Sequence, residues 1–369
     1  MSLNGMPSPE ADAATMAAAV LHGRHDLRFE RVPVPRASRG ELLVEVTTVG
    51  VCGTDAAEWE HGPKLMPLES RHPVTGHLGP LVMGHEFAGR VVAVGEGVDE
   101  TILGTLVASC GAAPCGDCAE CAGGRSNVCR RYAAVGLHRD GALARYVTVP
   151  AASCVDVGAL GIDDVDAALV QPMSIAVHAA RRSGVAAGDI AIVQGVGGVG
   201  AFLIHVLASQ GVRVVAVDLA ADRLRVAREL GAATTVVGGT DDTAAVLAAT
   251  WADRIPVFFE VTGTPRGVAL ALDVVPMGTT IVQVGIAKAP FPLDLARVTV
   301  RELSLIGTNA MVRETDLSDA ARLVAARAGR WGLVAPAPIA AERIVDDALR
   351  PMAEGRPPAI KTLVLPPSG

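Results

Sequence analysis

Residues 189–218 read DIAIVQGVGGVGAFLIHVLASQGVRVVAVD and carry the strongest fold signal in the chain. An apolar run at 190–194 leads into a glycine-rich turn, a helix-length apolar segment follows, and a second apolar run ends at Asp218. A strand, a Gly-x-Gly-x-x-Gly turn and a helix in this order are typical of a parallel sheet that binds a dinucleotide. We therefore expect a doubly wound α/β sheet around this stretch.

The glycines of the turn each have a physical reason to be there. Gly195 permits the tight turn, Gly197 lets a pyrophosphate approach the backbone, and Gly200 lets the helix pack closely on the strand. The helix N-terminus then presents unpaired N–H groups to the phosphates. We predict that four glycines of the turn bind the cofactor: Gly195, Gly197, Gly198 and Gly200.

The residue at the end of the second strand bears on which dinucleotide binds. Asp218 lies 18 residues beyond Gly200, and its carboxylate can accept hydrogen bonds from the adenosine ribose hydroxyls while repelling a 2′-phosphate. NAD is therefore favoured over NADP. Arg223 lies five residues further along and could reach a phosphate, so it is a second candidate cofactor contact and leaves NADP open.

Outward from this stretch, the chain has two regions that differ in their pattern of apolar runs and turn residues. The first 150 residues hold short apolar runs separated by turn residues, which predicts a β-rich region. From about residue 170 strands alternate with helical segments, which predicts a parallel sheet. Segments after about residue 310 end in AIKTLVLP and are too few to form their own core, so we expect them to rejoin the first region. The expected strands of the sheet are 190–194, 212–217, 234–237, 257–260, 280–284 and 304–306.

Composition excludes several classes of partner. The chain has 369 residues, a formal net charge of −7 and 3% aromatic residues, and it has no long basic run, so nucleic acid is not expected as a partner. Residues 1–15 contain no basic region before an apolar core, so they predict a disordered extension rather than a secretory signal. Residues 190–212 are long enough to cross a bilayer, but five glycines interrupt them, so no membrane span is expected.

Four of the seven cysteines have the spacing of a metal site. They form C-x2-C-x2-C-x7-C, which can bring four thiolates around one tetrahedral ion from a single looping segment. A structural zinc ion is the favoured occupant, while a pair of disulfides or an iron–sulfur cluster stays open. Cys110 and Cys154 lie outside the spacing and are expected to be buried thiols. The four predicted ligands are Cys115, Cys118, Cys121 and Cys129.

Two segments of the β-rich region contain a second possible metal site. GVCGTD begins at Gly50 and GHEFAGRVVAVG begins at Gly84. Cys52, His85 and Glu86 together are the mixed donor set expected at a catalytic zinc with one position left open. Each of them alone is more simply a core thiol or a capping group, so the prediction depends on their combination.

These motifs, taken in order, carry a resemblance to a known family. GVCGTD, GHEFAGRVVAVG, the four cysteines, GVGGVG and Asp218 resemble the zinc-containing medium-chain dehydrogenases of the alcohol, sorbitol and butanediol dehydrogenase group. The insert that contains HPVTG is most similar to butanediol dehydrogenases. The resemblance implies a GroES-like catalytic domain at residues 16–168 and 309–369, with a Rossmann NAD-binding domain at 169–308 inserted between.

The resemblance also implies roles for individual residues. Cys52 and His85 would bind the catalytic zinc, Glu86 would be a direct or exchangeable ligand, and Asp55 would orient the imidazole of His85. Thr54 would hydrogen-bond the substrate oxygen and pass on its proton. Asp and Thr also favour ordinary turns, so turn chemistry alone could account for Thr54 and Asp55.

Two positions depart from the family pattern. Gln171 stands where many relatives have a glutamate next to the zinc, and its carbonyl oxygen would bind the metal without adding a negative charge. Ala57 stands where relatives often have a relay histidine, so protons would leave through water, the ribose hydroxyls or His61. His178, on an expected helix, would serve packing or lie next to the cofactor.

The expected function is a zinc-dependent, NAD-dependent dehydrogenase that interconverts a secondary alcohol or vicinal diol with its ketone. Val284, Gly285 and Ile286 would lie beside the nicotinamide. A reductase of imines or conjugated carbonyls, and a non-enzymatic NAD-binding redox sensor, are the alternatives. We expect a small-molecule substrate, a cytoplasmic location, and a homodimer or homotetramer paired through an edge strand near residues 299–307.

Overall fold

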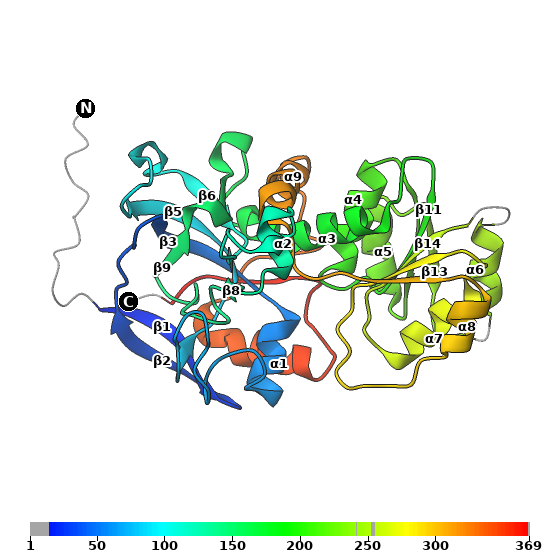
Figure 1. Cartoon of the computed structure of the whole chain (residues 1–369), viewed down its shortest axis with the longest axis horizontal. Coiled ribbons are helices and arrows are strands. Elements are labelled where there is room, and N and C mark those ends of the chain that lie inside the picture. Colours follow the sequence, from blue (N-terminus) through cyan, green and yellow to red (C-terminus); the bar gives the residue numbers. More distant parts are fainter. Residues whose placement is uncertain (1–14, 241, 252–254, 368–369) are drawn as a thin grey trace.

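The computed structural model describes residues 15–240, 242–251 and 255–367. The predicted disordered extension therefore lies outside the described residues, apart from Thr15, which is the first residue of β1. The chain forms a β-rich half and a half built on a parallel sheet, which lie side by side in Figure 1. Among the described residues, none of the helices is both long enough and apolar enough to cross a membrane.

The β-rich half is organised by a six-stranded sheet in the order β10-β6-β5-β3-β17, with β9 also paired to β3. The central strand β3 is almost entirely buried because neighbouring elements cover both of its faces. Three further strands form the sheet β2-β1-β4, and β7 pairs with β8. The strands of this half are β1 (Thr15–Gly23), β2 (Asp26–Pro33), β3 (Glu41–Val51), β4 (Leu81–Val82), β5 (Glu86–Val94), β6 (Leu106–Ser109), β7 (Ala112–Ala113), β8 (Ala133–Ala134), β9 (Tyr146–Pro150), β10 (Cys154–Asp156) and β17 (Thr362–Val364).

The C-terminal segment returns to the β-rich half. Strand β17 pairs antiparallel with the end of β3, where Thr362 lies opposite Val51. An apolar strand of this kind gains most by completing an existing sheet, because a lone strand leaves its backbone groups unpaired. This pairing brings residue 361 to the place where β3 ends.

The other half is a six-stranded parallel sheet in the order β13-β12-β11-β14-β15-β16. The predicted doubly wound sheet is confirmed, and its first strand lies at the centre, next to the point where the strand order reverses. Strand β12 is shifted by one residue from the expected range, β15 ends one residue earlier and β16 ends one residue later. The strands are β11 (Ile190–Gln194), β12 (Arg213–Asp218), β13 (Thr234–Val237), β14 (Val257–Glu260), β15 (Thr280–Gln283) and β16 (Ser304–Gly307).

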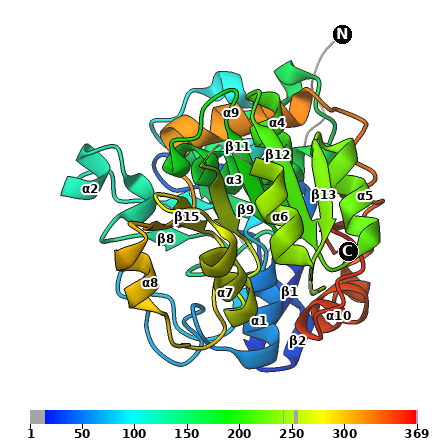
Figure 2. The same ribbon diagram turned by 90° about the vertical axis from the view of Figure 1, so that its right-hand side faces the viewer.

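Both faces of the parallel sheet are covered by helices (Figure 2). Ala191 and Val193 pack in one core with α3, α4, α5 and α9, whereas Ile190 and Ile192 pack in another with α6 and α7. Alternate residues of a strand point to opposite faces, which explains why this run is apolar throughout. The helices are α1 (Gly53–His61), α2 (Ala119–Ala122), α3 (Val170–Ser183), α4 (Gly200–Ser209), α5 (Ala221–Glu229), α6 (Thr243–Trp251), α7 (Pro265–Val274), α8 (Leu295–Val300), α9 (Arg313–Ala325) and α10 (Arg350–Ala353).

Candidate active site and metal centres

The residues predicted as catalytic zinc ligands meet at one end of the sheet in the β-rich half. Cys52 follows β3 and precedes α1, whereas His85 and Glu86 stand at the start of β5. Gly50 and Glu86 are partners in the antiparallel pair of β3 and β5, so the two segments arrive side by side. The ligand atoms of Cys52, His85 and Glu86 all lie within 4.8 Å of one another. One metal ion can therefore contact all three.

Asp55 joins the start of α1 to His85. Its Oδ2 accepts a hydrogen bond from the backbone N–H of Cys52 at 2.8 Å, which completes a capping box at the helix N-terminus. Its Oδ1 lies 3.3 Å from Nδ1 of His85. Because Nδ1 is turned toward Asp55, Nε2 is the ring nitrogen left for a metal ion. Asp55 thus has both the local turn contact and the geometry of an orienting group.

A buried lysine that the sequence did not single out borders the same cluster. Lys361 precedes β17, and its Nζ lies 2.9 and 2.6 Å from the two carboxylate oxygens of Glu86 and 3.3 Å from the carbonyl oxygen of Val51. Both charged side chains are at most 5% exposed. Solvent therefore screens this pair little, and each charge depends on the other. Glu86 has a fixed partner besides any metal ion.

The charges around the cluster favour a cation at its centre. Burial lowers the pKa of His85, but Asp55 and Cys52 outweigh burial and hold this pKa well above its usual range. Burial also lowers the pKa of Lys361, but Glu86 and Cys52 outweigh burial and raise this pKa above its usual value. A pocket that stabilises a proton on a buried imidazole also stabilises a metal ion in the place of that proton. A thiolate, an imidazole and a carboxylate suit zinc.

The other residues predicted near the catalytic metal lie on α3 and α1 and differ from one another in burial and contacts. Gln171 is the second residue of α3 and is 7% exposed, and its Oε1 has no hydrogen-bond partner among the described residues. A buried amide oxygen without a donor is unfavourable, so a ligand there would stabilise it. The hydroxyl of Thr54 lies 3.7 Å from Sγ of Cys52. Ala57 lies within α1, and His61 is exposed at the end of this helix.

The four remaining predicted ligands meet in a lobe around α2. The sulfur separations are 3.3 Å between Cys115 and Cys129, 3.5 Å between Cys118 and Cys121, and 3.8 Å between Cys118 and Cys129. A tetrahedral zinc with Zn–S bonds of about 2.3 Å spaces its sulfur atoms by about 3.8 Å. All four cysteines are free thiols. The lobe therefore fits one ion, and it contains neither of the disulfides that the spacing left open.

Polar contacts tie this four-cysteine lobe to the helices between the two halves. Ser126 donates a hydrogen bond to Glu314 at 2.6 Å, and the side-chain amide of Asn127 lies 3.2 Å from Nε2 of His178. On its other side His178 lies 3.0 Å from the buried carboxylate of Asp316. His178 is buried in this polar network, which links α3 to α9. The position agrees with a packing role, one of the two roles expected for this residue.

The glycine-rich turn has the geometry that its spacing predicts. Gly195 adopts a φ of +100°, and a Cβ at Gly200 would lie 1.8 Å from the carbonyl oxygen of Gly195. A Cβ at Gly197 would meet nothing within 4 Å, so the turn is open where a pyrophosphate would approach. A Cβ at Gly198 would lie 3.9 Å from Nζ of Lys361. The lysine paired with Glu86 therefore also borders this turn.

Asp218 holds the glycine-rich turn and keeps acceptor capacity for a ligand. Its two carboxylate oxygens accept hydrogen bonds from the backbone N–H groups of Val196 at 2.7 Å and Ala220 at 2.9 Å. A carboxylate oxygen can accept more than one hydrogen bond, so ribose hydroxyls can still bind. The guanidinium of Arg223 lies 4.0 Å from the same carboxylate. The pair carries opposite charges where the adenosine ribose is expected.

The segment predicted to lie beside the nicotinamide follows β15. Val284 and Gly285 both donate backbone hydrogen bonds to the carbonyl oxygen of Glu260, the last residue of β14. Two consecutive N–H groups on one acceptor interrupt the regular ladder, and β15 ends one residue earlier than expected. Ile286 is 85% exposed. An apolar side chain this exposed at the carboxyl edge of the sheet is suited to contact a bound ring.

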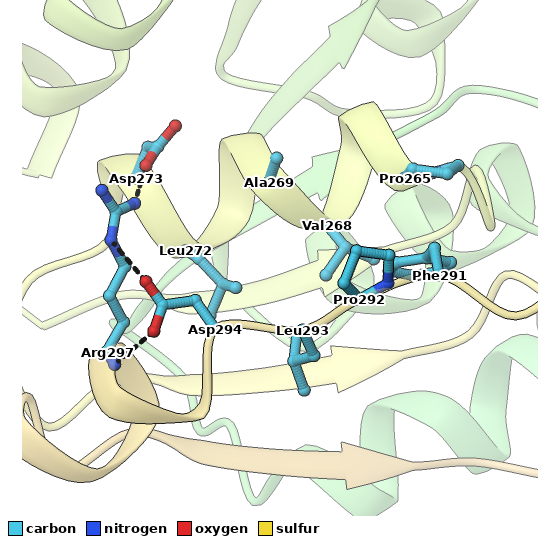
Figure 3. Close-up of a pocket in the computed structure, with 10 residues that line it drawn as sticks. All are labelled: Pro265, Val268, Ala269, Leu272, Asp273, Phe291, Pro292, Leu293, Asp294 and Arg297. Carbon is cyan, nitrogen blue, oxygen red and sulfur yellow. Dashed lines mark hydrogen bonds and ion pairs between the residues drawn. The ribbon is translucent and has the colours of Figure 1, made fainter.

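A pocket of about 150 Å³ lies elsewhere, between α7 and the segment that leads into α8. Figure 3 shows Arg297 between Asp273 and Asp294 at one end of this pocket, so the charges there are paired within the protein. Apolar side chains, among them Val268, Leu272 and Leu293, line the rest. None of the predicted site residues borders it, and the metal cluster and the glycine-rich turn have no part in it.

Comparisons with known proteins agree with this geometry. The model of the alcohol dehydrogenase GroES-like domain matches residues 38–159, and the model of the zinc-binding dehydrogenase matches residues 198–326. The (R,R)-butanediol dehydrogenase of Neisseria gonorrhoeae is 31% identical over 300 residues, which cover 80% of this chain and 84% of the relative. The (R,R)-butanediol dehydrogenase of Bacillus subtilis is 34% identical over 259 residues, 68% and 71% of the two chains.

A solved structure extends the likeness to the whole fold. The crystal structure of 2R,3R-butanediol dehydrogenase from Bacillus subtilis superimposes with a TM-score of 0.85 at 28% identity, and the match covers 95% of this chain and 99% of the other. The fold and the two clusters thus define a zinc-binding oxidoreductase with a GroES-like domain and a Rossmann sheet. The chain belongs to the zinc-dependent medium-chain alcohol dehydrogenase family. It is an enzyme, and its cofactors are zinc and a nicotinamide dinucleotide.

Among the buried charged residues that the sequence did not single out, Lys361 and Glu260 contact the predicted metal and cofactor segments. Lys361 is the lone charge in the apolar stretch AIKTLVL, and Glu260 ends the apolar strand β14. Lysine and glutamate are rarely buried without partners. A single charge within an apolar strand was therefore the signal available for both residues, although it does not identify the partner.

Proposed function

We propose that the chain interconverts a secondary alcohol or a vicinal diol with its ketone, using NAD. The observation that carries this proposal is the cluster of Cys52, His85 and Glu86, which supplies three ligands where zinc takes four and so leaves a position for the substrate. Bound there, zinc would act as a Lewis acid on the substrate oxygen, and NAD would accept or return the hydride.

The residues of the cluster have distinct tasks in this proposal. Cys52 and His85 hold the metal, and Asp55 fixes the imidazole so that Nε2 points to it. Glu86 is shared between the metal and Lys361. Gln171 would offer a neutral oxygen to the metal in exchange with Glu86, which would leave the metal more electron-withdrawing than a glutamate at this position would.

Proton transfer would begin at Thr54. Its hydroxyl lies close enough to the cluster, 3.7 Å from Sγ of Cys52, to hydrogen-bond a substrate oxygen bound beside that sulfur. A hydroxyl both donates and accepts, so it can take the substrate proton and pass another onward. With alanine at position 57, the next carrier would be water, a ribose hydroxyl or His61.

NAD rather than NADP is proposed because of Asp218. Its carboxylate lies at the end of β12, where the adenosine ribose binds in such sheets, and would repel a 2′-phosphate. Gly195, Gly197, Gly198 and Gly200 would hold the pyrophosphate, and the segment at 284–286 would lie beside the nicotinamide. Arg223 at 4.0 Å from Asp218 weakens the repulsion without removing it.

A substrate panel combined with metal analysis tests the proposal. We expect about two zinc ions per chain, with NADH formed from secondary alcohols, vicinal diols or polyols and less product from NADP. The names of the two butanediol dehydrogenases support including (R,R)-butanediol, with its other stereoisomers for comparison. A zinc-loaded protein that reduces no NAD with any member of the panel would refute the assignment.

We also propose the domain division at 16–168 with 309–369 and at 169–308. A homodimer or homotetramer would form through the edge strand β16 and the end of α8, where Leu305 and Val300 are 42% and 75% exposed. The four-cysteine lobe, with its free thiols, supports a reducing compartment such as the cytoplasm. Light scattering of the purified protein measures the oligomeric state directly, and a monomer would contradict the pairing.

A further inference from the structure

Glu260 is a fully buried carboxylate at the carboxyl edge of the parallel sheet. It belongs to a row of polar residues on three neighbouring strands, because Gln194, Glu260 and Gln283 are direct partners in register. Glu260 is 0% exposed, and no cation of the described residues forms an ion pair with it. A buried anion of this kind persists only where several donors surround it.

The carboxylate binds the loop that follows β14. One oxygen accepts the backbone N–H of Thr262 at 2.9 Å and also the hydroxyl of Thr262. The other oxygen accepts the backbone N–H of Gly263 at 2.9 Å and the side-chain amide of Gln283 at 2.7 Å. Four donors thus converge on one side chain, and they come from two different segments.

The same residue also binds the loop that follows β15. The carbonyl oxygen of Glu260 accepts the backbone N–H groups of Val284 at 2.9 Å and Gly285 at 3.0 Å. The amide of Gln283, already bonded to the carboxylate, donates a second hydrogen bond to the carbonyl oxygen of Gly285 at 2.8 Å. The segment at 284–286 is therefore attached to Glu260 through both its main chain and its side chain.

The two loops touch each other and the glycine-rich turn. A Cβ at Gly285 would lie 2.1 Å from the backbone nitrogen of Gly263, so the two backbones cross with no room for a side chain. A Cβ at Gly195 would lie 3.0 Å from a methyl carbon of Thr262. A shift of the loop bound by Glu260 would therefore displace the segment at 284–286 first.

We propose that Glu260 is a positioning residue for the nicotinamide half of the cofactor. It acts through the segment at 284–286 and leaves the adenosine half to Asp218 and the glycine-rich turn. The inference rests on the proposed function, in which this segment lies beside the nicotinamide ring. A buried residue outside both metal clusters would thus control where the hydride-bearing ring is held.

Substitution Glu260→Gln tests the proposal with the smallest change in shape. One carboxylate oxygen becomes an NH2 group, which cannot accept hydrogen bonds and faces two donors. Gln283→Ala is the milder second variant, because it removes only the bridge between the carboxylate and Gly285. Glu58→Gln is the matched control: Glu58 is a carboxylate 1% exposed that accepts the backbone N–H groups of Lys64 and Leu65 in the other half.

Binding of NADH and of ADP-ribose, which lacks the nicotinamide, is measured by calorimetry for each zinc-loaded protein. We expect Glu260→Gln to weaken NADH binding about tenfold and to change ADP-ribose binding less than about twofold. Gln283→Ala should lower the ratio of NADH affinity to ADP-ribose affinity by about threefold. Glu58→Gln should leave this ratio unchanged.

Equal losses for both nucleotides would overturn the proposal, because Glu260 would then support the whole site without preference for the ring. Unchanged binding of both would also overturn it. Should Glu260→Gln fail to fold, the ratio measured with Gln283→Ala decides in the same way. Wild-type protein that binds neither nucleotide would instead refute the proposed function itself, so the two failures are distinguishable.

Discussion

The two cysteine-containing clusters of this chain, which we propose as metal sites, have different partners around them. In the four-cysteine lobe all ligands are thiols from residues 115–129, and three of the four are only half-buried. In the cluster of Cys52, His85 and Glu86 the donors are mixed, come from the end of β3 and the start of β5, and lie next to the buried charges of Asp55 and Lys361. The lobe would close around its ion with four thiolates, whereas the second cluster would leave one coordination position open and surround it with charge.

This difference indicates that ligand type alone does not distinguish a structural metal site from a catalytic one. Cysteine is present in both clusters, but only the mixed cluster has buried neighbours that adjust the charge at the metal. Its carboxylate is already paired with a lysine, and its imidazole is oriented by an aspartate. We therefore attribute reactivity to the surrounding groups and stability to the closed lobe.

The largest effect should come from removing one thiol from each cluster. Cys52→Ser is expected to reduce kcat by about a thousandfold or more while one zinc remains bound in the lobe. Cys118→Ser is expected to lower the melting temperature and to release the zinc of the lobe. Metal content, activity and thermal unfolding of both variants measure the contrast. Equal losses of activity and stability in both would remove the distinction.

Breaking the buried ion pair should have the next largest effect. Lys361→Met leaves Glu86 as an unpaired buried anion, which should lower the free energy of unfolding of the zinc-free protein by about 3 kcal/mol. Zinc binding should recover part of this loss because the metal supplies the missing positive charge. Urea unfolding with and without zinc measures both quantities.

The double variant Lys361→Met with Glu86→Gln is the control for that experiment. Removing both charges should restore most of the stability, since no unpaired charge is left in the interior. A single variant as stable as the wild type would show that solvent reaches the pair. That outcome would contradict the buried geometry of Glu86 and Lys361.

Asp55→Asn should have a smaller effect, confined to the mixed cluster. The amide loses the negative charge that faces Nδ1 of His85 at 3.3 Å, so zinc affinity there should fall about 10-fold to 100-fold. The lobe should keep its zinc. Competition with a chromophoric chelator resolves the two ions. Weaker binding at both clusters would show that the substitution acts on the fold rather than on His85.

The smallest effect concerns thiol reactivity in the zinc-free protein. The side chain of Asp117 raises the pKa of Cys115, but Arg131 and the backbone N–H of Asp117 lower it more, to about 7. Burial raises the pKa of Cys154 to about 12. Because only the thiolate reacts, alkylation of Cys115 should increase as pH rises through 7, while Cys154 stays unreactive.

Mass spectrometry after iodoacetamide treatment at a series of pH values measures both sites at once. Zinc should abolish the labelling of Cys115 and leave Cys154 as it was. Labelling of Cys115 that does not change with zinc would show that this thiol is not a ligand. This result would leave the lobe without a closed site.

Local sequence patterns predicted most of what lies close together in the chain. The strands of the parallel sheet, the glycine-rich turn and the four-cysteine spacing are each contained in short segments, where periodicity and steric limits act directly. Cys52 and His85 were grouped by their donor types and by the family resemblance rather than by a local pattern, because their meeting depends on the register of β3 with β5. The resemblance and the α/β plus GroES-like fold are confirmed.

What escaped prediction depends on distant contacts. Lys361 meets Glu86 only because the C-terminal strand returns to β3, and Glu260 binds loops from two strands. Ser126 and Glu314 likewise meet although 188 positions separate them in the sequence. Patterns of charge and apolarity show that such residues need a partner, but the partner is decided by packing of the whole fold.

Anomalous diffraction at the zinc edge tests the central claim most directly. Crystals of the zinc-loaded protein should show one peak inside the four-cysteine lobe and a second peak in contact with Sγ of Cys52 and a ring nitrogen of His85. The second peak should keep a coordination position that no protein atom fills. A peak in the lobe alone, with Cys52 and His85 in contact with no metal, would contradict the account.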